Sequence, residues 1–518
     1  MQNGLCGAGY HPCCHAARNP AKPAIIMGES GQVITYGELD ALSNRVAQLY
    51  RKQGLQIGDT VAICLDNHPL YLALTWGAQR SGLVYITLSY RLTAPELDYI
   101  LRDSGAKLLI GFEALASVLD DVRELSPQVD QLRFGARGSL DLDAVLAAMS
   151  AEPIADQRAG TDMMYSSGTT GRPKGVVIGL PENPAIDGEH WVTTKVSAEL
   201  FGWNAESIYL SPAPMYHAAP VRFSMATQRL GGTVVIMEKF DAEAALALIE
   251  KYRITDSQWV PTHFIRLLAL PESTRRKYDL SSLKTAVHAA APCPIPVKEA
   301  MIAWWGAAVI EYYAASEGHG ISFITAAESL THPGSVGRAR VGVLHICDEN
   351  GDALPARTEG HVYFESQNKF SYHNEPQKTR EAYNKHGWAT VGDIGWLDEE
   401  GYLYLTDRKS FMIISGGVNI YPQEIENLII MHPKVLDVAV IGAPDPEMGE
   451  RVVAVVQPRS LADAGPALAD EITEWLGPQL TRVKLPRQID FRAELPREPT
   501  GKLFKRKLRD EYRAASGK

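Results

Sequence analysis

Residues 36–260 alternate between short apolar stretches and longer amphipathic ones, and this rhythm restricts the possible folds more than any other feature. Apolar residues recur at helical spacing from Leu39 to Leu49, and Gly54 ends the pattern. A further helix is expected through Tyr71 and Trp76. Buried strands are expected at 60–65, 106–112 and 232–238. Repeated strand–helix–strand units predict a mostly parallel sheet with helices on both faces.

Composition limits what such a chain does. Its 518 residues are 45% hydrophobic and 22% charged, as in a globular protein of about three domains. With 51 basic and 61 acidic residues the net charge is −10, which argues against a nucleic-acid partner or an anionic membrane surface. No apolar run approaches the ~18–20 residues of a membrane span. We expect a cytoplasmic protein without a transmembrane segment, with a homodimer left open.

The pattern changes near residue 360. Short alternating stretches separated by Gly and Asp are typical of antiparallel hairpins. After Arg408 a compact segment follows, with an expected helix at 422–432 and a strand at 435–442. We therefore expect two units, an N-terminal one at 1–408 and a C-terminal one at 409–518.

Hydroxyl side chains and glycines dominate residues 165–175, YSSGTTGRPKG. Backbone N–H groups of such a loop can close around phosphate oxygens because Gly has no side chain, and Lys174 adds a positive charge. The loop is not a Walker A motif, since no Gly-Lys-Ser/Thr occurs and Pro173 removes a donor. A solvent-exposed Ser/Gly loop is the alternative for this segment alone.

Other segments give this loop its context: EYYAASEG at 311–318, GDIGWLDEEGYLYLTDR at 392–408, ISGGVNIYPQEIE at 414–426 and LPREPTGKLFK at 495–505. In this order they resemble the motifs of the adenylate-forming (AMP-binding) superfamily, in its acyl-CoA synthetase branch. The sequence of the whole chain is similar to those of bacterial fatty-acyl and steroid-side-chain CoA ligases. The resemblance implies an α/β fold: layered α/β subdomains with a β-rich subdomain, then a small mobile α+β C-terminal domain.

The resemblance also implies ATP, Mg²⁺ and CoA as co-substrates and cofactor. Lys502 would be catalytic, because a cation delivered to the α-phosphate stabilises the transition state. Glu317 and Thr170 would assist it and hold Mg²⁺ through oxygen. The expected ATP-binding residues are Ser166, Ser167, Gly168, Thr169, Thr170, Gly171, Lys174, Ala290, Ala291, Tyr313, Ser316, Asp393 and Arg408.

Two further sites follow from the resemblance. Ser415, Gly416 and Gly417 would line the CoA tunnel after the C-terminal domain rotates about Ser410. Relatives usually carry Asp or Lys at that hinge, and Glu311 and Tyr312 also replace the usual residues, so the hinge and the adenine side depart from the pattern.

The acyl pocket would be lined by His217, Val221, Trp259, Val260, His288 and Ala289. A roomy apolar pocket without an acidic group suits a large hydrophobic carboxylic acid, such as a fatty acid or a steroid or bile-acid side chain. An aryl acid of the cinnamate or benzoate type is the alternative substrate, and a carrier protein the alternative acyl acceptor. A non-enzymatic nucleotide-binding regulator is disfavoured because Lys502, Glu317 and Asp393 are all present.

Overall fold

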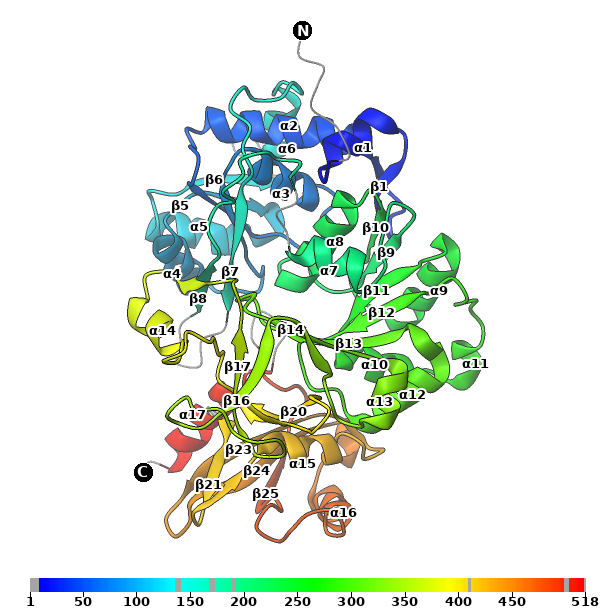
Figure 1. Cartoon of the computed structure of the whole chain (residues 1–518), viewed down its shortest axis with the longest axis vertical. Helices are drawn as coiled ribbons and strands as arrows, with labels where there is room; N and C mark the ends of the chain where they lie inside the picture. Colours follow the sequence, from blue (N-terminus) through cyan, green and yellow to red (C-terminus); the bar gives the residue numbers. More distant parts are fainter. Residues whose placement is uncertain are drawn as a thin grey trace.

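The computed structural model describes residues 9–135, 141–166, 173–188, 192–408, 411–497 and 503–516. Within these ranges the strands form four sheets, of nine, seven, four and five strands. The two large sheets belong to the N-terminal part, and the sheet of the C-terminal part lies at the opposite end of the molecule (Figure 1). No helix in these ranges is long and apolar enough to cross a membrane.

The seven-stranded sheet has a parallel centre and an antiparallel edge. Its strands run in the order β18 (Ser371–Tyr372), β8 (Lys174–Val177), β7 (Thr161–Ser166), β4 (Val84–Thr87), β3 (Thr60–Ile63), β5 (Ala106–Phe112) and β6 (Asp130–Phe134). Its crossover helices include α3 (Tyr71–Arg80), α4 (Ala94–Ser104) and α5 (Ala116–Leu125). The parallel sheet predicted from the strand–helix rhythm is confirmed.

The nine-stranded sheet is parallel from β1 to β13 and antiparallel at both edges. Its order is β15 (Arg338–Val341), β14 (Ile321–Thr325), β13 (Val309–Ala314), β12 (Thr285–His288), β11 (Asp256–Trp259), β9 (Ile208–Ser211), β10 (Thr233–Ile236), β1 (Pro23–Met27) and β2 (Val33–Thr35). The helices packed with it include α2 (Tyr36–Lys52), α7 (Val192–Glu199), α8 (Ala218–Arg229), α9 (Ala242–Tyr252), α10 (Pro261–Leu268) and α12 (Ile295–Trp305).

Helix α2 shows how the sequence sets these elements. The Thr35 side chain accepts the N–H of Glu38, and the Glu38 carboxylate accepts the N–H of Thr35, which satisfies two donors at the helix start. The helix then buries Leu39, Val46 and Leu49 at the spacing read from the sequence. Its amphipathic face thus fixes α2 against the core.

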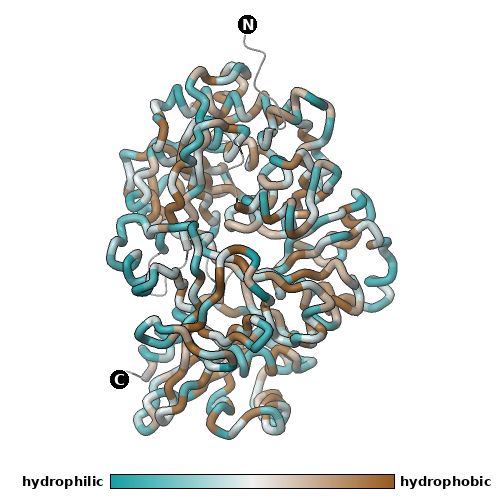
Figure 2. The backbone as a smooth tube through the Cα atoms, viewed as in Figure 1, coloured by the Kyte–Doolittle hydropathy of each residue, from teal (hydrophilic) through white to brown (hydrophobic). Residues whose placement is uncertain are grey.

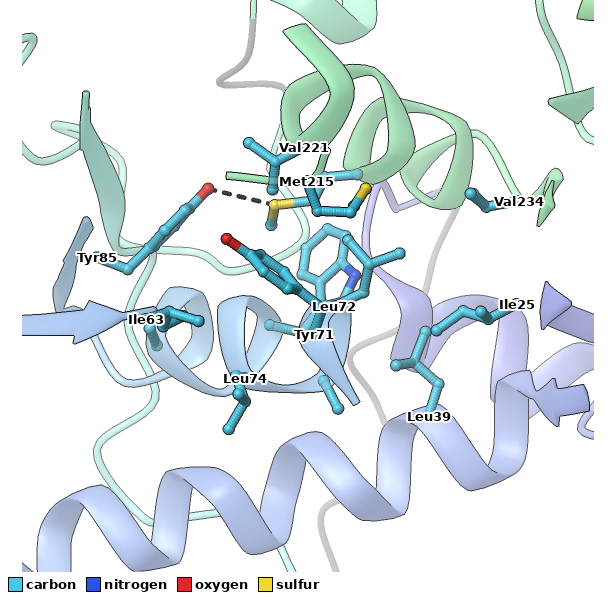
Figure 3. Close-up of a cluster of buried hydrophobic side chains, with 14 of the residues drawn as sticks. Ile25, Leu39, Ile63, Tyr71, Leu72, Leu74, Tyr85, Met215, Val221 and Val234 are labelled. Atoms are coloured by element: carbon cyan, nitrogen blue, oxygen red, sulfur yellow. Dashed lines mark hydrogen bonds between the residues drawn. The ribbon is translucent and has the colours of Figure 1, made fainter. Parts of the chain in front are cut away.

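One hydrophobic cluster joins the two large sheets. It contains Ile25 from the nine-stranded sheet, Ile63 and Tyr85 from the seven-stranded sheet, and Val221 from α8. In Figure 3 the side chains of α3 lie beneath Val221 and Met215, between the two sets of strands. The two large sheets therefore share one core, which holds the carboxyl ends of their strands in place.

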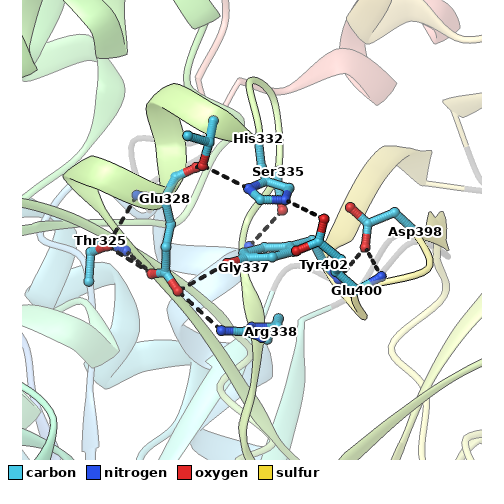
Figure 4. A network of polar contacts seen from close by, with 10 residues as sticks. Thr325, Glu328, His332, Ser335, Gly337, Arg338, Asp398, Glu400 and Tyr402 are labelled. Carbon is cyan, nitrogen blue, oxygen red and sulfur yellow. Dashed lines mark hydrogen bonds and ion pairs between the residues drawn. The ribbon is translucent and has the colours of Figure 1, made fainter.

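A four-stranded antiparallel sheet follows, in the order β16 (Val343–Cys347), β17 (Gly360–Glu365), β19 (Asp393–Leu397) and β20 (Leu403–Arg408). Helix α13 (Ala326–Thr331) is tied to it by Glu328, whose carboxylate accepts bonds from Thr325 and, at 3.1 Å, from the Tyr402 hydroxyl (Figure 4). Antiparallel pairing also occurs before the predicted change near 360, in the pairs β1–β2, β7–β8 and β13–β14, because antiparallel neighbours close the edges of the two large sheets.

The C-terminal part, residues 411–516, has its own sheet. Its strands are β21 (Ile413–Ser415), β22 (Val418–Ile420), β23 (Val435–Asp445), β24 (Gly449–Pro458) and β25 (Gln488–Phe491), and its helices are α15 (Pro422–Ile429), α16 (Pro466–Leu476) and α17 (Lys505–Ser516). Two hydrophobic clusters drawn from residues 413–512 cover its faces. Hydrophobic stretches follow its strands in Figure 2. The α/β class with a small α+β C-terminal part is confirmed.

Candidate active site

The predicted phosphate loop connects β7 and β8, which pair antiparallel with Ser166 opposite Lys174. Of this loop Ser167, Gly168, Thr169, Thr170 and Gly171 lie outside the described residues, as does the side chain of Ser166. The loop begins at the carboxyl end of β7 in the seven-stranded sheet. In open α/β sheets, ligands bind at the carboxyl ends of the strands.

Lys174 and Glu317 are brought together by a residue that the sequence did not single out. The Tyr372 hydroxyl donates to Glu317 Oε1 at 2.9 Å, and Lys174 Nζ lies 4.7 Å from the centroid of the Tyr372 ring. Burial and the positive charge of Lys378 lower the pKa of Lys174. The negative charge of Glu317 opposes this shift, because it favours the charged form of Lys174. Tyr372 reaches this place because β18 pairs with β8, a long-range contact that local sequence does not reveal.

A buried ion pair underlies the Glu317 loop. Arg222 of α8 places Nη2 at 2.6 Å from Asp162 Oδ2 on β7, and its Nη1 donates to the Ser316 carbonyl at 3.3 Å. Burial alone would lower the pKa of Arg222, but Asp162 outweighs burial and the pKa is raised. One guanidinium thus links the strand that enters the phosphate loop with the loop that carries Glu317. Neither partner stands in a motif, so the sequence alone does not mark them.

Asp393 and Tyr313, predicted for ribose and adenine, are in direct contact. The Tyr313 hydroxyl donates to Asp393 Oδ2 at 2.6 Å, and the Tyr313 ring stacks on Phe364 at 6.3 Å between centroids. Asp393 lies opposite Arg408 in the β19–β20 ladder, while the Arg408 side chain is outside the described part. The structure therefore groups these positions, and their roles toward a nucleotide stay predictions.

His217 ends the segment after β9 and is the N-cap residue of α8. Burial, followed by the positive charge of Arg91, lowers the pKa of His217 to about 4, so the imidazole is neutral at pH 7. Val221, one turn further along α8, is fully buried in the shared core. These two predicted pocket residues therefore share one helix end.

The remaining predicted pocket residues lie at the carboxyl ends of β11 and β12 or directly after them. Trp259 and His288 are fully buried in a second core cluster with α10 and α12, and Ala289 is also buried. Val260 is half-buried, and Ala290 and Ala291 are exposed. Ala290 has φ +75°, a left-handed conformation that costs a residue with a Cβ about 1 kcal/mol. Such strain often marks functional sites.

The departure at Glu311 has a structural explanation. Glu311 points toward α12 and forms an ion pair with Lys298, and both side chains are buried. Its Oε1 is 4.0 Å from Nδ1 of His288. Burial raises the pKa of Glu311, and Lys298 opposes that effect. The acid is thus paired within the core next to the β12 end.

In the C-terminal part, Ser415 is buried at the end of β21, and Gly416 and Gly417 form the turn to β22 with φ +56° and +78°. Two successive positive φ values explain why both turn residues are glycines. Ser410 and Lys502 lie outside the described residues.

The chain on either side of Lys502 is described. Arg497 and Leu503 form an antiparallel bridge that closes the loop containing Lys502. The pKa of Arg91 is raised, first by Tyr90 and in smaller part by Glu494. The charge of Arg91 also lowers the pKa of His217, so Arg91 interacts both with Glu494, in the segment before the loop, and with the start of α8.

Comparison with known proteins agrees with this arrangement. Residues 14–371 match the AMP-binding enzyme family, and residues 424–502 match the AMP-binding enzyme C-terminal domain. A long-chain fatty-acid–CoA ligase of Mycobacterium tuberculosis is 34% identical, over 96% of this chain and 97% of that protein. A feruloyl-CoA synthase of an Amycolatopsis species is 33% identical, over 98% of this chain and 99% of that protein.

A solved structure supports the same assignment. The ATP-bound MatB of Rhodopseudomonas palustris superposes with a TM-score of 0.80 at 29% identity, covering 98% of this chain and 99% of that one. The use of ATP and CoA fits the family. The chain belongs to the AMP-binding, or adenylate-forming, enzymes and is an AMP-forming acid–thiol ligase of the acyl-CoA synthetase branch.

Proposed function

We propose that this enzyme activates a hydrophobic carboxylic acid, a fatty acid or a bulky steroid or bile-acid side chain, and transfers it to CoA. The observation that carries the proposal is the convergence of Lys174 and Glu317 on Tyr372 beside the phosphate loop. A lysine at the start of β8, opposite the carboxyl end of β7, and a carboxylate just after the carboxyl end of β13 suit a magnesium-bound triphosphate. The contact between Tyr313 and Asp393 would hold the nucleoside.

The first half-reaction would form an acyl adenylate. A carboxylate oxygen of the acid attacks the α-phosphorus of ATP, the bond to the bridging oxygen breaks, and pyrophosphate leaves. Lys502 would stabilise the charge that develops on the phosphate oxygens. Glu317 and Thr170 would hold Mg²⁺, which shields the charge of the phosphates when bound; the hard carboxylate oxygens of Glu317 fit that ion.

The second half-reaction would form the thioester. The CoA sulfur, after losing its proton, attacks the acyl carbon; the bond from that carbon to the phosphate oxygen breaks, and AMP leaves with the bonding electrons. We place the domain boundary at 408/409, between an N-terminal domain of 1–408 and a mobile C-terminal domain of 409–518 that rotates about Ser410. The exposed glycine turn at Gly416 and Gly417 would then line the tunnel for the CoA arm.

The hydrophobic substrate is supported by the surroundings of Val221. Asp162, a carboxylate next to this part of α8, is buried and paired with Arg222, so it is not available to an amino-acid ammonium group. An aryl acid is the second candidate, because Phe201, Phe223 and Tyr312 form an aromatic cluster next to Arg222, and aromatic rings pack well on one another.

The test is pyrophosphate release over a panel of fatty, steroid-side-chain and aryl acids, with and without CoA, followed by mass analysis of the product. A CoA thioester of a fatty or steroid acid is the expected product. Preference for cinnamate-type acids would favour the aryl alternative. Accumulation of acyl-AMP without CoA consumption would point to a carrier-protein acceptor and contradict the proposed CoA step.

A further inference from the structure

A buried lysine lies just after the loop that contains Lys502. Lys505 begins α17, and its ammonium group is 2.8 Å from both carboxylate oxygens of Glu426 on α15. Each of the two side chains is 9% exposed. Lys and Glu are almost never buried to this degree unless they are paired. The pair is therefore a specific connection between the start of α17 and α15.

Glu426 is itself fixed by the sheet. Its Oε1 accepts the backbone N–H of Val440, on the long strand β23, at 2.6 Å. On the other side, the Lys505 ammonium lies 5.4 Å from the centroid of the Phe411 ring, a cation–π contact. Phe411 directly follows Ser410, the predicted hinge. Three segments thus meet at one ammonium group: the chain after the hinge, helix α15, and the chain after Lys502.

Backbone contacts hold the same loop at its base. Leu503 bridges to Arg497, and the N–H of Phe504 donates to the Pro496 carbonyl at 2.8 Å. Leu503 also packs on the cluster that contains Leu495 and Leu508. These contacts fix the two described ends of the segment that contains Lys502. The ion pair adds a directional contact that joins the loop to the helix and the chain next to the hinge.

We propose that Lys505 and Glu426 are positioning residues for the adenylation step: they keep the Lys502 loop in a fixed relation to the hinge-side chain, so that domain closure brings the Lys502 ammonium to the α-phosphate. This inference rests on the proposed function of Lys502. Replacing a buried ion pair by uncharged groups is often neutral for stability, whereas a displacement of about 1 Å at a reacting centre can cost about 100-fold in rate. Placement is therefore the main contribution of this pair.

The experiment compares the two half-reactions in the full-length protein. The double substitution Lys505→Met with Glu426→Gln removes both charges and keeps an amide oxygen for the Val440 N–H. Adenylation is followed by ATP–pyrophosphate exchange with the best acid of the panel. Thioester formation is followed from the synthetic adenylate of that acid and CoA, a step that does not use Lys502.

We expect adenylation to fall about 10- to 100-fold and thioester formation to stay within about threefold of wild type. Lys505→Arg, which keeps the charge and a contact to Glu426, should restore most of the adenylation rate. An equal fall in both half-reactions would show a merely structural pair and overturn the proposal. Unchanged adenylation in the folded double variant would overturn it as well.

A control pair lies in the same part of the chain. Lys434 places Nζ at 2.8 Å from both oxygens of Glu471 on α16, and these two side chains are 45% and 43% exposed. Lys434→Met with Glu471→Gln should leave both half-reactions unchanged. A wild-type protein that consumes no ATP with any acid would contradict the proposed function itself. Wild-type turnover with full adenylation by the Lys505/Glu426 variant would contradict the positioning role alone.

Discussion

The N-terminal and C-terminal parts hold their functional groups in different ways. In the N-terminal part, Glu317 follows the end of β13 and the phosphate loop follows the end of β7. These two parallel strands belong to sheets that share one hydrophobic cluster. In the C-terminal part, the residues on either side of Lys502 pack on a sheet with its own clusters. The contacts between the parts include a bond from the Tyr421 hydroxyl to Glu359 and the packing of Met431 on the N-terminal core.

This difference suggests that the two parts contribute to catalysis in different ways. Groups fixed by a common core are preorganised, which lowers the cost of reorganisation in the transition state. A group on a separately packed unit depends on how that unit docks, and relative motion is the default where the interface is small and polar. The enzyme would therefore hold the nucleotide with rigid residues and supply the decisive cation by closure.

The largest expected effect tests the delivered group. Lys502→Ala should lower adenylation about 10²- to 10³-fold, because it removes the cation that stabilises the developing charge. Thioester formation from a supplied adenylate should change by less than about threefold. Lys507→Ala, an exposed lysine of α17, is the control and should leave both steps intact. Wild-type adenylation in Lys502→Ala would end the proposed mechanism.

The second effect tests the fixed part. Arg222→Met frees the Glu317 loop and leaves Asp162 as a buried, unpaired charge, which costs about 3–5 kcal/mol of stability. Combining it with Asp162→Asn removes that charge. In the folded double variant we expect kcat/KM for MgATP to fall about 10- to 100-fold.

Its control removes an ion pair at the far edge of the same sheet. Arg133 on β6 is 4% exposed and lies 2.6 Å from Asp120, which is 59% exposed. Arg133→Met with Asp120→Asn should leave kcat/KM for MgATP unchanged. If the Arg222/Asp162 variant behaves like this control, the ion pair under the Glu317 loop contributes only to the fold.

A third prediction concerns the rigid core behind His217. His263 is 8% exposed, stacks on Phe240 at 4.1 Å, and has its pKa lowered to about 3 by burial, then by Arg266 and His217. Below pH 6.5 the unfolded chain binds a proton that the folded chain does not, so stability falls as the pH falls toward 3. At pH 5 the loss is at most about 2 kcal/mol.

The comparison of wild type with His263→Phe checks this. The difference between the urea midpoints at pH 7.5 and pH 5 should be smaller in the variant, because phenylalanine keeps the stacking and has no proton to bind. Equal pH dependence in both proteins would show that the pKa of His263 does not differ between the folded and unfolded states as expected.

Local patterns in the sequence predicted much of this structure. The apolar spacing of 36–54 and the run at 106–112 became α2 and β5 because their burial is decided within one element. The contacts around Glu317 were not predictable in this way. Arg222, Asp162 and Tyr372 come from three segments far apart in the sequence, and nothing local marks them. Glu311 was seen as a departure, but its partner Lys298 depends on how α12 packs on the sheet.

The smallest effect separates two roles of Tyr372. Its hydroxyl orients Glu317, and its ring lies under the Lys174 ammonium. Tyr372→Phe removes the first contact and keeps the second. One hydrogen bond to a charged group should then be lost, and we expect adenylation to fall about 3- to 10-fold, with a rise in the Mg²⁺ concentration needed for half-maximal rate.

The control for this change is Tyr383→Phe. The Tyr383 hydroxyl lies in the same segment and donates to the Phe370 carbonyl at 2.9 Å, away from Glu317. It should leave the Mg²⁺ dependence unchanged. If Tyr372→Phe also leaves it unchanged, Glu317 does not need its hydroxyl partner, and the rigid part of the site is held by Arg222 and the Ser316 carbonyl alone. A shift in Tyr372→Phe only would show that the preorganisation of the N-terminal part extends to single hydrogen bonds.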